Sequence, residues 1–156
     1  MHRNPFSDAE LDRRLDAVRR AAEARGLDAL ALSAPENVFY LTGLDHWGYF
    51  APHLLLVPLD RRPVLVTRAM EEVAVANMVR NATFRGHSDD ATTAGAAAAA
   101  LAEMGLAGAR LGYEAWSSGM SAGSAAQLAQ ALDARWRDVT GLVDALRLVK
   151  SAEEQA

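Results

Sequence analysis

From residue 64 onward the sequence alternates short apolar runs with longer segments of helical periodicity, and this alternation most restricts the fold. Strand-like runs occupy residues 64–67, 82–87, 110–113 and 136–139. The segments that follow them, residues 69–79, 92–104, 121–132 and 140–148, have the composition and spacing of helices. Alternation of this kind is typical of a sheet covered by helices on both faces. With no internal repeat or linker, the pattern predicts one α/β domain.

The first 26 residues predict an amphipathic helix. Ser7 and Glu10 form the pattern of a capping box, in which the hydroxyl and the carboxylate each accept a hydrogen bond from a backbone N–H at the helix start. Gly26 suits the left-handed end of the helix. One apolar stripe at helical spacing is made of Leu11, Leu15, Val18 and Ala22.

The region between this helix and residue 64 predicts a buried strand and a β-hairpin. Residues 27–33 form a short apolar run, and residues 35–40 suit a turn or short helix that ends at Gly43. A second strand over 50–57 is joined to the strand at 64–67 by a proline-bounded turn at 58–63. We therefore expect an antiparallel element beside the strands that alternate with helices.

Composition excludes several classes of function. The 156 residues have a formal net charge of −4 and no dense basic stripe, so a nucleic-acid partner is not expected. Arg13-Arg14 and Arg19-Arg20 lie beside acidic residues and predict a solvated, ion-paired helix face. The chain has no cysteine, which excludes disulfides and thiolate chemistry. No apolar run approaches about 18 residues, so we expect no membrane span and a cytoplasmic location.

The densest group of aromatic and turn-forming residues lies between residues 35 and 53. Five aromatic residues fall within twelve positions and are interleaved with polar side chains. Such a cluster suits either a recognition surface or an aromatic core that closes one end of the sheet. The aromatic residues are Phe39, Tyr40, Trp47, Tyr49 and Phe50, and the polar ones are Asn37, Asp45, His46 and His53.

No complete catalytic centre is recognisable in the sequence. Asp45, His46 and His53 carry donors suited to a metal, but their loop lacks the paired spacing that fixes ligand geometry, so no metal is expected here. Ser117-Ser118 has no base at a motif spacing, and there is neither a G-x-S-x-G turn nor a phosphate loop. Asp89-Asp90 is expected to cap a helix, and the methionines of 69–79 are expected to fill the core.

Four motifs, in order and with consistent spacing, resemble the N-terminal domain of the creatinase/prolidase/aminopeptidase P family, the metallohydrolases whose catalytic domain has the pita-bread fold. The resemblance covers nearly the whole chain, and the family usually has proline where this chain has Ala152. The motifs are Gly26-Leu27-Asp28-Ala29-Leu30, Pro35-Glu36-Asn37-Val38-Phe39-Tyr40-Leu41-Thr42-Gly43, Leu111-Gly112-Tyr113-Glu114 and Leu142-Val143-Asp144-Ala145-Leu146-Arg147-Leu148-Val149-Lys150-Ser151-Ala152-Glu153-Glu154.

The resemblance implies a three-layer α/β/α fold of the ribonuclease H-like type, with a mixed, roughly six-stranded sheet. It also implies that residues 1–148 form the N-terminal domain and that 149–156 begin a linker helix to a catalytic domain absent from this chain. That domain would hold two divalent metal ions (Mn, Zn or Co) through two Asp, one His and two Glu. All four histidines of this chain precede Asp133, Asp138 and Asp144, so this ligand order cannot be built here.

Family members are typically dimers in which the loop after the Tyr-Leu-Thr-Gly motif reaches the partner subunit's active site. The resemblance therefore implies a homodimer that acts on a small peptide or other small molecule, with no role for nucleic acid or membrane. Arg68 is a possible carboxylate binder, although an ordinary surface role fits it as well. The substrate-pocket loop would consist of Asp45, His46, Trp47, Tyr49, Phe50 and His53, with Arg68 beside it.

The residues and the resemblance favour a non-catalytic domain of a hydrolase of the Xaa-Pro dipeptidase or aminopeptidase P type. In this interpretation the fragment alone is not an enzyme, and the parent protein is. A stand-alone ligand-binding or dimerisation module of the same fold remains an alternative. A creatinase-like amidinohydrolase is another, but Pro52 stands where the creatinase loop has an arginine that binds the substrate carboxylate.

Overall fold

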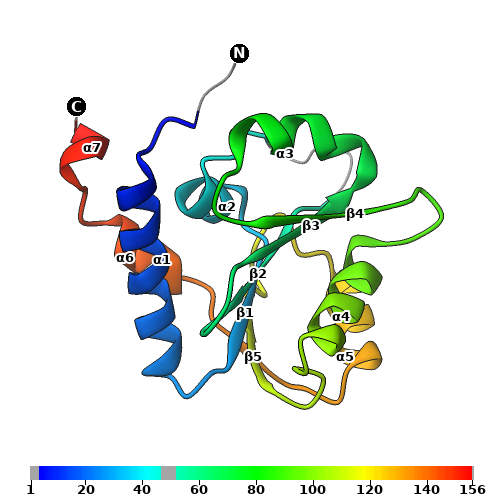
Figure 1. Cartoon of the computed structure of the whole chain (residues 1–156). Helices are drawn as coiled ribbons and strands as arrows, with labels where there is room; N and C mark the ends of the chain where they lie inside the picture. Colours follow the sequence, from blue (N-terminus) through cyan, green and yellow to red (C-terminus); the bar gives the residue numbers. More distant parts are fainter. Residues whose placement is uncertain (1–3, 47–51, 156) are drawn as a thin grey trace.

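The computed structural model describes residues 4–46 and 52–155 and has a single six-stranded sheet at its centre (Figure 1). The strand order is β4-β3-β2-β1-β5-β6. Strand β2 pairs antiparallel with both β1 and β3, whereas the β1–β5, β3–β4 and β5–β6 pairs are parallel. The strands are β1 (Ala29–Leu32), β2 (Leu54–Pro58), β3 (Val64–Arg68), β4 (Thr83–His87), β5 (Arg110–Tyr113) and β6 (Arg135–Asp138).

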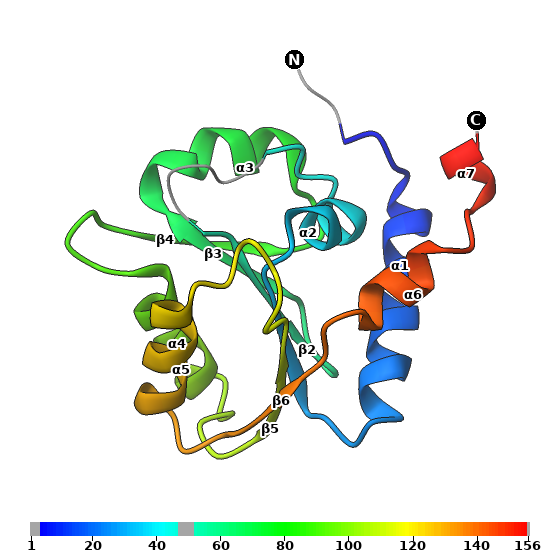
Figure 2. The same cartoon turned by 180° about the vertical axis from the view of Figure 1, so that it is seen from behind.

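Helices cover both faces of this sheet, which confirms the predicted mixed three-layer α/β fold (Figures 1 and 2). One face packs against α1, α2, α3 and α6, and the other packs against α4 and α5. The small helix α7 lies near the start of α1. The helices are α1 (Asp8–Glu23), α2 (Pro35–Thr42), the 3₁₀ turn η1 (Ala69–Glu71), α3 (Glu72–Met78), α4 (Thr93–Glu103), α5 (Ala122–Ala131), α6 (Leu142–Arg147) and α7 (Ala152–Gln155).

The side-chain alternation of the central strands explains the two helical layers. In β1, Leu30 and Leu32 face one core cluster, whereas Ala29 and Ala31 face the other. Successive side chains of a strand point to opposite faces, so a continuously apolar strand needs a helical layer on each side. The small alanines of β1 lie on the side of the alanine-rich helix α4, where short side chains allow the helix to approach the sheet closely.

Element boundaries follow the predicted stop and start signals. Gly26, Gly43 and Gly105 all have positive φ angles, of 68°, 73° and 76°, as expected after helix ends. The strand predicted from residue 50 begins only at Leu54 among the described residues. Within residues 4–46 and 52–155, no helix is long and apolar enough to cross a membrane.

The predicted capping box at the start of α1 is only half formed. The hydroxyl of Ser7 accepts the backbone N–H of Glu10 at 3.1 Å, as expected. The carboxylate that accepts the Ser7 N–H, at 3.0 Å, belongs to Glu153 and not to Glu10. The Glu10 carboxylate instead binds the guanidinium groups of Arg13 and Arg14. The start of α1 is therefore joined to the C-terminal segment.

The prediction that the paired arginines of α1 are all solvated is wrong for Arg14. This side chain is fully buried, with its guanidinium carbon 3.8 Å from the ring centroid of Phe6 and 4.3 Å from that of Tyr40. It donates to a Glu10 carboxylate oxygen at 2.7 Å and to the Tyr40 carbonyl at 2.8 Å. Stacking on aromatic rings and a partner carboxylate compensate the desolvation of the guanidinium group.

Two further local predictions are wrong. The N-cap of α4 is Thr92, whose hydroxyl accepts the Gly95 N–H at 3.0 Å, whereas Asp89 forms an ion pair with Arg68. Met78 is buried as predicted, but Met70, which belongs to η1, is 63 % exposed. Val73, on the same segment, is exposed as well.

Candidate functional site

Residues of the motifs that carry the family resemblance meet at one buried carboxylate, that of Glu114. It follows β5 and accepts hydrogen bonds from the backbone N–H groups of Ser33 at 2.6 Å and Ala34 at 2.7 Å. It also accepts the side-chain amide of Asn37 at 2.5 Å. These donors lie at the end of β1 and in the first turn of α2, where a negative charge is favourable. Glu114 thus fixes the start of the helix that leads to the aromatic loop.

The environment of Glu114 has opposing effects on its charge. Burial raises the pKa of this carboxyl, while the hydrogen bonds from Ala34, Asn37 and Ser33 act in the opposite direction. The amide oxygen of Asn37 also accepts a hydrogen bond from Arg147 at 3.0 Å. Residues from three separate motifs therefore form one connected network at the start of α2.

The other motif residues hold β1 against β5. Asp28 accepts the Arg110 backbone N–H at 2.8 Å and its guanidinium at 2.6 Å, and these bonds lower the pKa of Asp28 to about 2. At Gly112, an added Cβ would lie 2.7 Å from a Leu30 methyl and 2.8 Å from a Val139 methyl. A glycine is therefore needed at this position for close packing on the face of the sheet that α1 and α6 cover.

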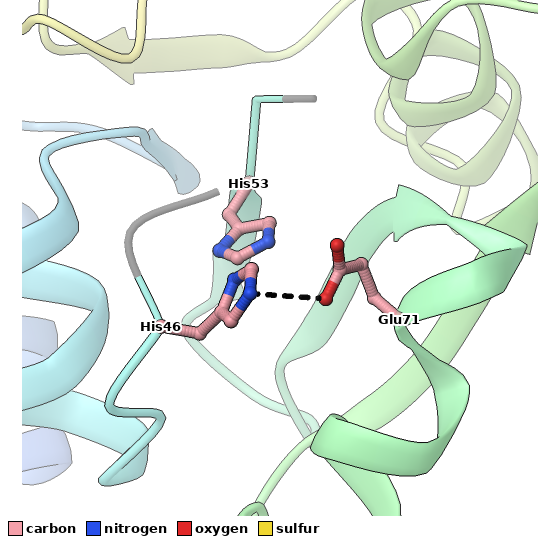
Figure 3. A group of neighbouring side chains, drawn as sticks. All are labelled: His46, His53 and Glu71. Carbon is pink, nitrogen blue, oxygen red and sulfur yellow. Dashed lines mark ion pairs between the residues drawn. The ribbon is translucent and has the colours of Figure 1, made fainter. Parts of the chain in front are cut away.

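The loop residues His46 and His53 lie together with Glu71 (Figure 3). One ligand atom from each of the three residues lies within 4.8 Å of the other two. The two imidazole rings have centroids 5.4 Å apart, and Nε2 of His46 lies 3.6 Å from a carboxylate oxygen of Glu71. The three residues come from separate segments: His46 follows α2, His53 precedes β2, and Glu71 ends η1.

The two histidines differ in how far their side chains are buried. His53 is only 5 % exposed, and its Nε2 makes no hydrogen bond within the described part of the chain. Burial, and to a lesser degree the nearby His46 ring, lowers the pKa of His53 from 6.5 to about 4. His53 is therefore neutral at neutral pH, and a neutral imidazole can act as a metal ligand through one of its ring nitrogens. The His46 side chain is 39 % exposed and connects the group to solvent.

Asp45 lies beside this group, at an open cavity of ≈ 270 Å³. The cavity is formed by the α2 segment, the chain that follows it and one residue of α6. Its lining consists of Pro35, Glu36, Phe39, Leu44, Asp45, His46 and Arg147. The remaining predicted loop residues, Trp47, Tyr49 and Phe50, lie outside the described residues.

Arg68 belongs to a different cavity from His46. Its guanidinium donates to Asp89 at 2.6 and 3.0 Å, and both residues line a cavity of ≈ 400 Å³ with His87 and Thr93. His87 is held there by contacts with the Ser88 carbonyl and the Thr93 hydroxyl. Of the predicted site residues, the structure therefore brings His46 and His53 together, places Asp45 beside them and leaves Arg68 in a separate environment.

Sequence reasoning missed Glu71. It lies in a predicted helix without a metal-binding motif, yet its side chain is 11 % exposed and faces the two histidines. The predicted β-hairpin could have indicated this contact. Its register pairs Leu54 with Val66, which brings the residue before β2 close to the residues that follow β3. In the described chain, these three residues form the one group with metal-compatible spacing.

Comparison with known families decides the classification. The Creatinase/Prolidase N-terminal domain model matches residues 14–149 of the chain. This chain belongs to that family. The match includes β1, the Glu114 network, the histidine group and α6, so the motifs that meet in the structure are parts of a family domain.

Two curated proteins and one solved structure illustrate the similarity. Ectoine hydrolase of Halomonas elongata is 37 % identical over 67 residues, which cover 43 % of this chain and 17 % of that protein. An uncharacterized hydrolase/peptidase, y4tM, of Sinorhizobium fredii is 27 % identical over 97 % of this chain and 41 % of its own length. Dipeptidase PepE from Mycobacterium ulcerans superposes with a TM-score of 0.79 at 24 % identity, over 96 % of this chain and 40 % of that one.

These coverages show that the chain spans less than half the length of the curated relatives and of PepE. The match to PepE confirms the fold, and the family match identifies the chain as a Creatinase/Prolidase N-terminal domain.

Proposed function

We propose that this domain is the non-catalytic part of a dinuclear-metal hydrolase of the Xaa-Pro dipeptidase or aminopeptidase P type. The observation that carries the proposal is the family match over residues 14–149. The similarity to dipeptidase PepE and to a hydrolase/peptidase of Sinorhizobium fredii supports it. The protein would work in the cytoplasm, on small peptides, without nucleic acid or membrane as a partner.

Hydrolysis would belong to a separate catalytic domain that holds two divalent ions, Mn, Zn or Co. Paired metal ions activate water and stabilise both the attacking and the leaving group. The sequence order of histidines and acidic residues supports placing this ligand set outside residues 1–156. Residues 1–148 would form the N-terminal domain, and 149–156 would begin the linker helix.

The structure supports a linker role for this last segment. Ser151 and Glu154 cap α7 reciprocally, with the Ser151 N–H donating to Glu154 at 3.0 Å and the Glu154 N–H donating to the Ser151 hydroxyl at 3.3 Å. Leu148 and Val149, just before α7, are 81 % and 80 % exposed. These apolar side chains offer surface that a following domain would cover.

In a homodimer, the loop that contains Asp45, His46, Trp47, Tyr49, Phe50 and His53 would form a wall of the partner subunit's substrate pocket. Its role would be to position substrate and exclude water, with no part in bond breaking. The exposed position of Asp45 and the partial exposure of His46 at an open cavity support this role. Arg68, paired with Asp89, would act only at the margin of the pocket.

Kinetics of loop variants in the full-length enzyme test this proposal. Trp47→Ala or Asp45→Ala should raise KM or lower kcat for an Xaa-Pro dipeptide without changing the content of the two catalytic metals. Arg20→Ala, on the exposed side of α1, is the matched surface control and should leave both constants unchanged. Wild-type kinetics in both loop variants would reject the pocket-wall role.

A second candidate follows from the 37 % identity with ectoine hydrolase, which covers 67 residues only. The same domain would then serve a hydrolase that acts on ectoine. Parallel assays of the full-length enzyme with ectoine and with a proline dipeptide distinguish the two candidates, since only one substrate should be turned over efficiently.

A further inference from the structure

We propose that His46, His53 and Glu71 bind one divalent transition-metal ion, with Zn²⁺ as the best match, in the N-terminal domain itself. The proposal is independent of the hydrolytic function proposed above. It also departs from the sequence-based expectation that the loop holds no metal, because Glu71 supplies a third ligand that the loop lacks.

The spacing of the three residues is close to that of a zinc site. Their ligand atoms lie within 4.8 Å of one another, and the His46–Glu71 pair is already at 3.6 Å. Tetrahedral zinc with bonds of about 2.0–2.1 Å places its ligand atoms about 3.3 Å apart. The group would therefore close by roughly 1 to 1.5 Å at its widest pair, a shift that small rotations of side chains can supply.

The buried nitrogen of His53 is a second, independent indication of a ligand. A buried polar atom without a hydrogen bond is costly, and native proteins seldom leave one without water or an ion. Nε2 of His53 has no hydrogen-bond partner in the described chain, although the side chain is about nineteen-twentieths buried. Figure 3 shows this imidazole above that of His46 and beside the Glu71 carboxylate. A metal ion between them would satisfy the nitrogen.

The chemistry of the three ligands selects the ion. Two imidazole nitrogens and one carboxylate oxygen suit Zn²⁺ and neighbouring transition metals, whereas Ca²⁺ and Mg²⁺ prefer ligand sets made entirely of oxygen. His46 is partly exposed, so a water molecule can reach a fourth position, as in open zinc sites. The Glu71 carboxylate would offset half of the ion's charge in a mostly buried setting.

The ion would connect three segments that are distant in sequence. His46 follows α2, His53 precedes β2 and Glu71 leads into α3. Binding to the folded state alone would raise the unfolding temperature in proportion to the logarithm of free zinc above the dissociation constant. The role assigned here is therefore structural, to fix the two ends of the loop region against η1.

Calorimetric titration of the chelator-treated chain with Zn²⁺ tests the site. We expect one ion per chain, and we expect His53→Ala and Glu71→Gln each to weaken binding by more than about tenfold. Glu103→Gln is the control, since Glu103 is an exposed carboxylate of α4 that pairs with Arg85, and it should retain wild-type affinity. Absence of stoichiometric binding, or equal affinity in all three variants, would overturn the proposal.

A measurement on the unmodified chain covers the case in which a variant does not fold. In ¹⁵N-histidine NMR spectra, zinc should shift one ring nitrogen of His46 and one of His53 and leave His87 unchanged. Mg²⁺ at the same concentration should produce no shift. Zinc-dependent changes confined to His2 or His87 would overturn the assignment of the site.

Discussion

Replacement of Glu114 by glutamine should destabilise the domain by about 2–4 kcal/mol, because this carboxylate fixes the start of α2. Glu114 accepts three hydrogen bonds, at 2.6, 2.7 and 2.5 Å, from Ser33, Ala34 and Asn37. Bonds to a charged group contribute about 1.5–3 kcal/mol each and neutral ones about 1 kcal/mol. One glutamine oxygen can still serve the two backbone donors, but its NH₂ group then faces the amide of Asn37, whose oxygen is already used by Arg147.

Relief of the desolvation of a buried charge reduces this loss, since burial raises the pKa of Glu114. The estimate of about 2–4 kcal/mol therefore lies below the sum of the three bonds. For a domain of this size it corresponds to a decrease of roughly 5–15 °C in melting temperature. Urea unfolding followed by circular dichroism at neutral pH measures the change directly.

Glu103→Gln is the matched control, because this exposed residue of α4 pairs with Arg85 at the surface. Its unfolding midpoint should stay close to that of the wild type. If Glu114→Gln destabilises the domain by less than about 1 kcal/mol, or no more than the control, the hydrogen-bond network of Glu114 does not have the structural role assigned to it.

Three further outcomes follow from the packing and charges. Gly112→Ala should cost about 1–3 kcal/mol by overpacking, since its Cβ would lie 2.7–3.0 Å from side-chain atoms of Leu30, Val139 and Leu27; an unchanged urea midpoint would argue against this packing. The Arg13 contact lowers the pKa of Glu10 from 4.5 to about 2, so its stabilisation is complete above about pH 5 and is lost as pH falls toward 2. Acid titration of Glu10→Gln should lack about 1–2 kcal/mol of this dependence, after allowance for the half-exposed Arg13, and an identical acid transition would refute the assignment. Arg14→Met should cost about 2–4 kcal/mol, because it removes the hydrogen bonds of the buried guanidinium to Glu10 and to the Tyr40 carbonyl while Arg13 still pairs with Glu10. Arg20→Met, at an exposed position of the same helix, should leave stability nearly unchanged, and equal urea midpoints would contradict the role of Arg14.

Sequence patterns predicted the helices and strands well because the start and end of an element depend on neighbouring residues. The apolar alternation after residue 64, the glycines at helix ends and the proline-bounded turn at 58–63 all act through neighbouring backbone. The motifs that carry the family resemblance were identified from the sequence. Their contact at Glu114 could not be predicted, because it depends on the parallel pairing of β1 with β5. Family resemblance named these motifs, and the hydrogen bonds explain why they occur together.

Two features that sequence reasoning missed depend on contacts between distant segments, whereas the burial of Arg14 follows from local spacing. Arg14 lies three residues after Leu11 and so shares the buried face of α1, although its charge suggested exposure. Glu71 reaches His53 only through the register of the β2–β3 hairpin. Glu153 replaces Glu10 in the cap of α1 because the C-terminal segment folds back on that helix. Neither Glu71 and His53 nor Glu153 and Ser7 fall within a single window of sequence, whereas the spacing that buries Arg14 is local.

The division of labour between this domain and a catalytic one is tested most directly by an activity assay. Purified residues 1–156 and the full-length polypeptide would each be incubated with Mn²⁺ and a proline dipeptide, before and after chelation. We predict metal-dependent hydrolysis by the full-length protein and no turnover above the blank by residues 1–156. Chelator-sensitive hydrolysis by residues 1–156 alone would contradict the account.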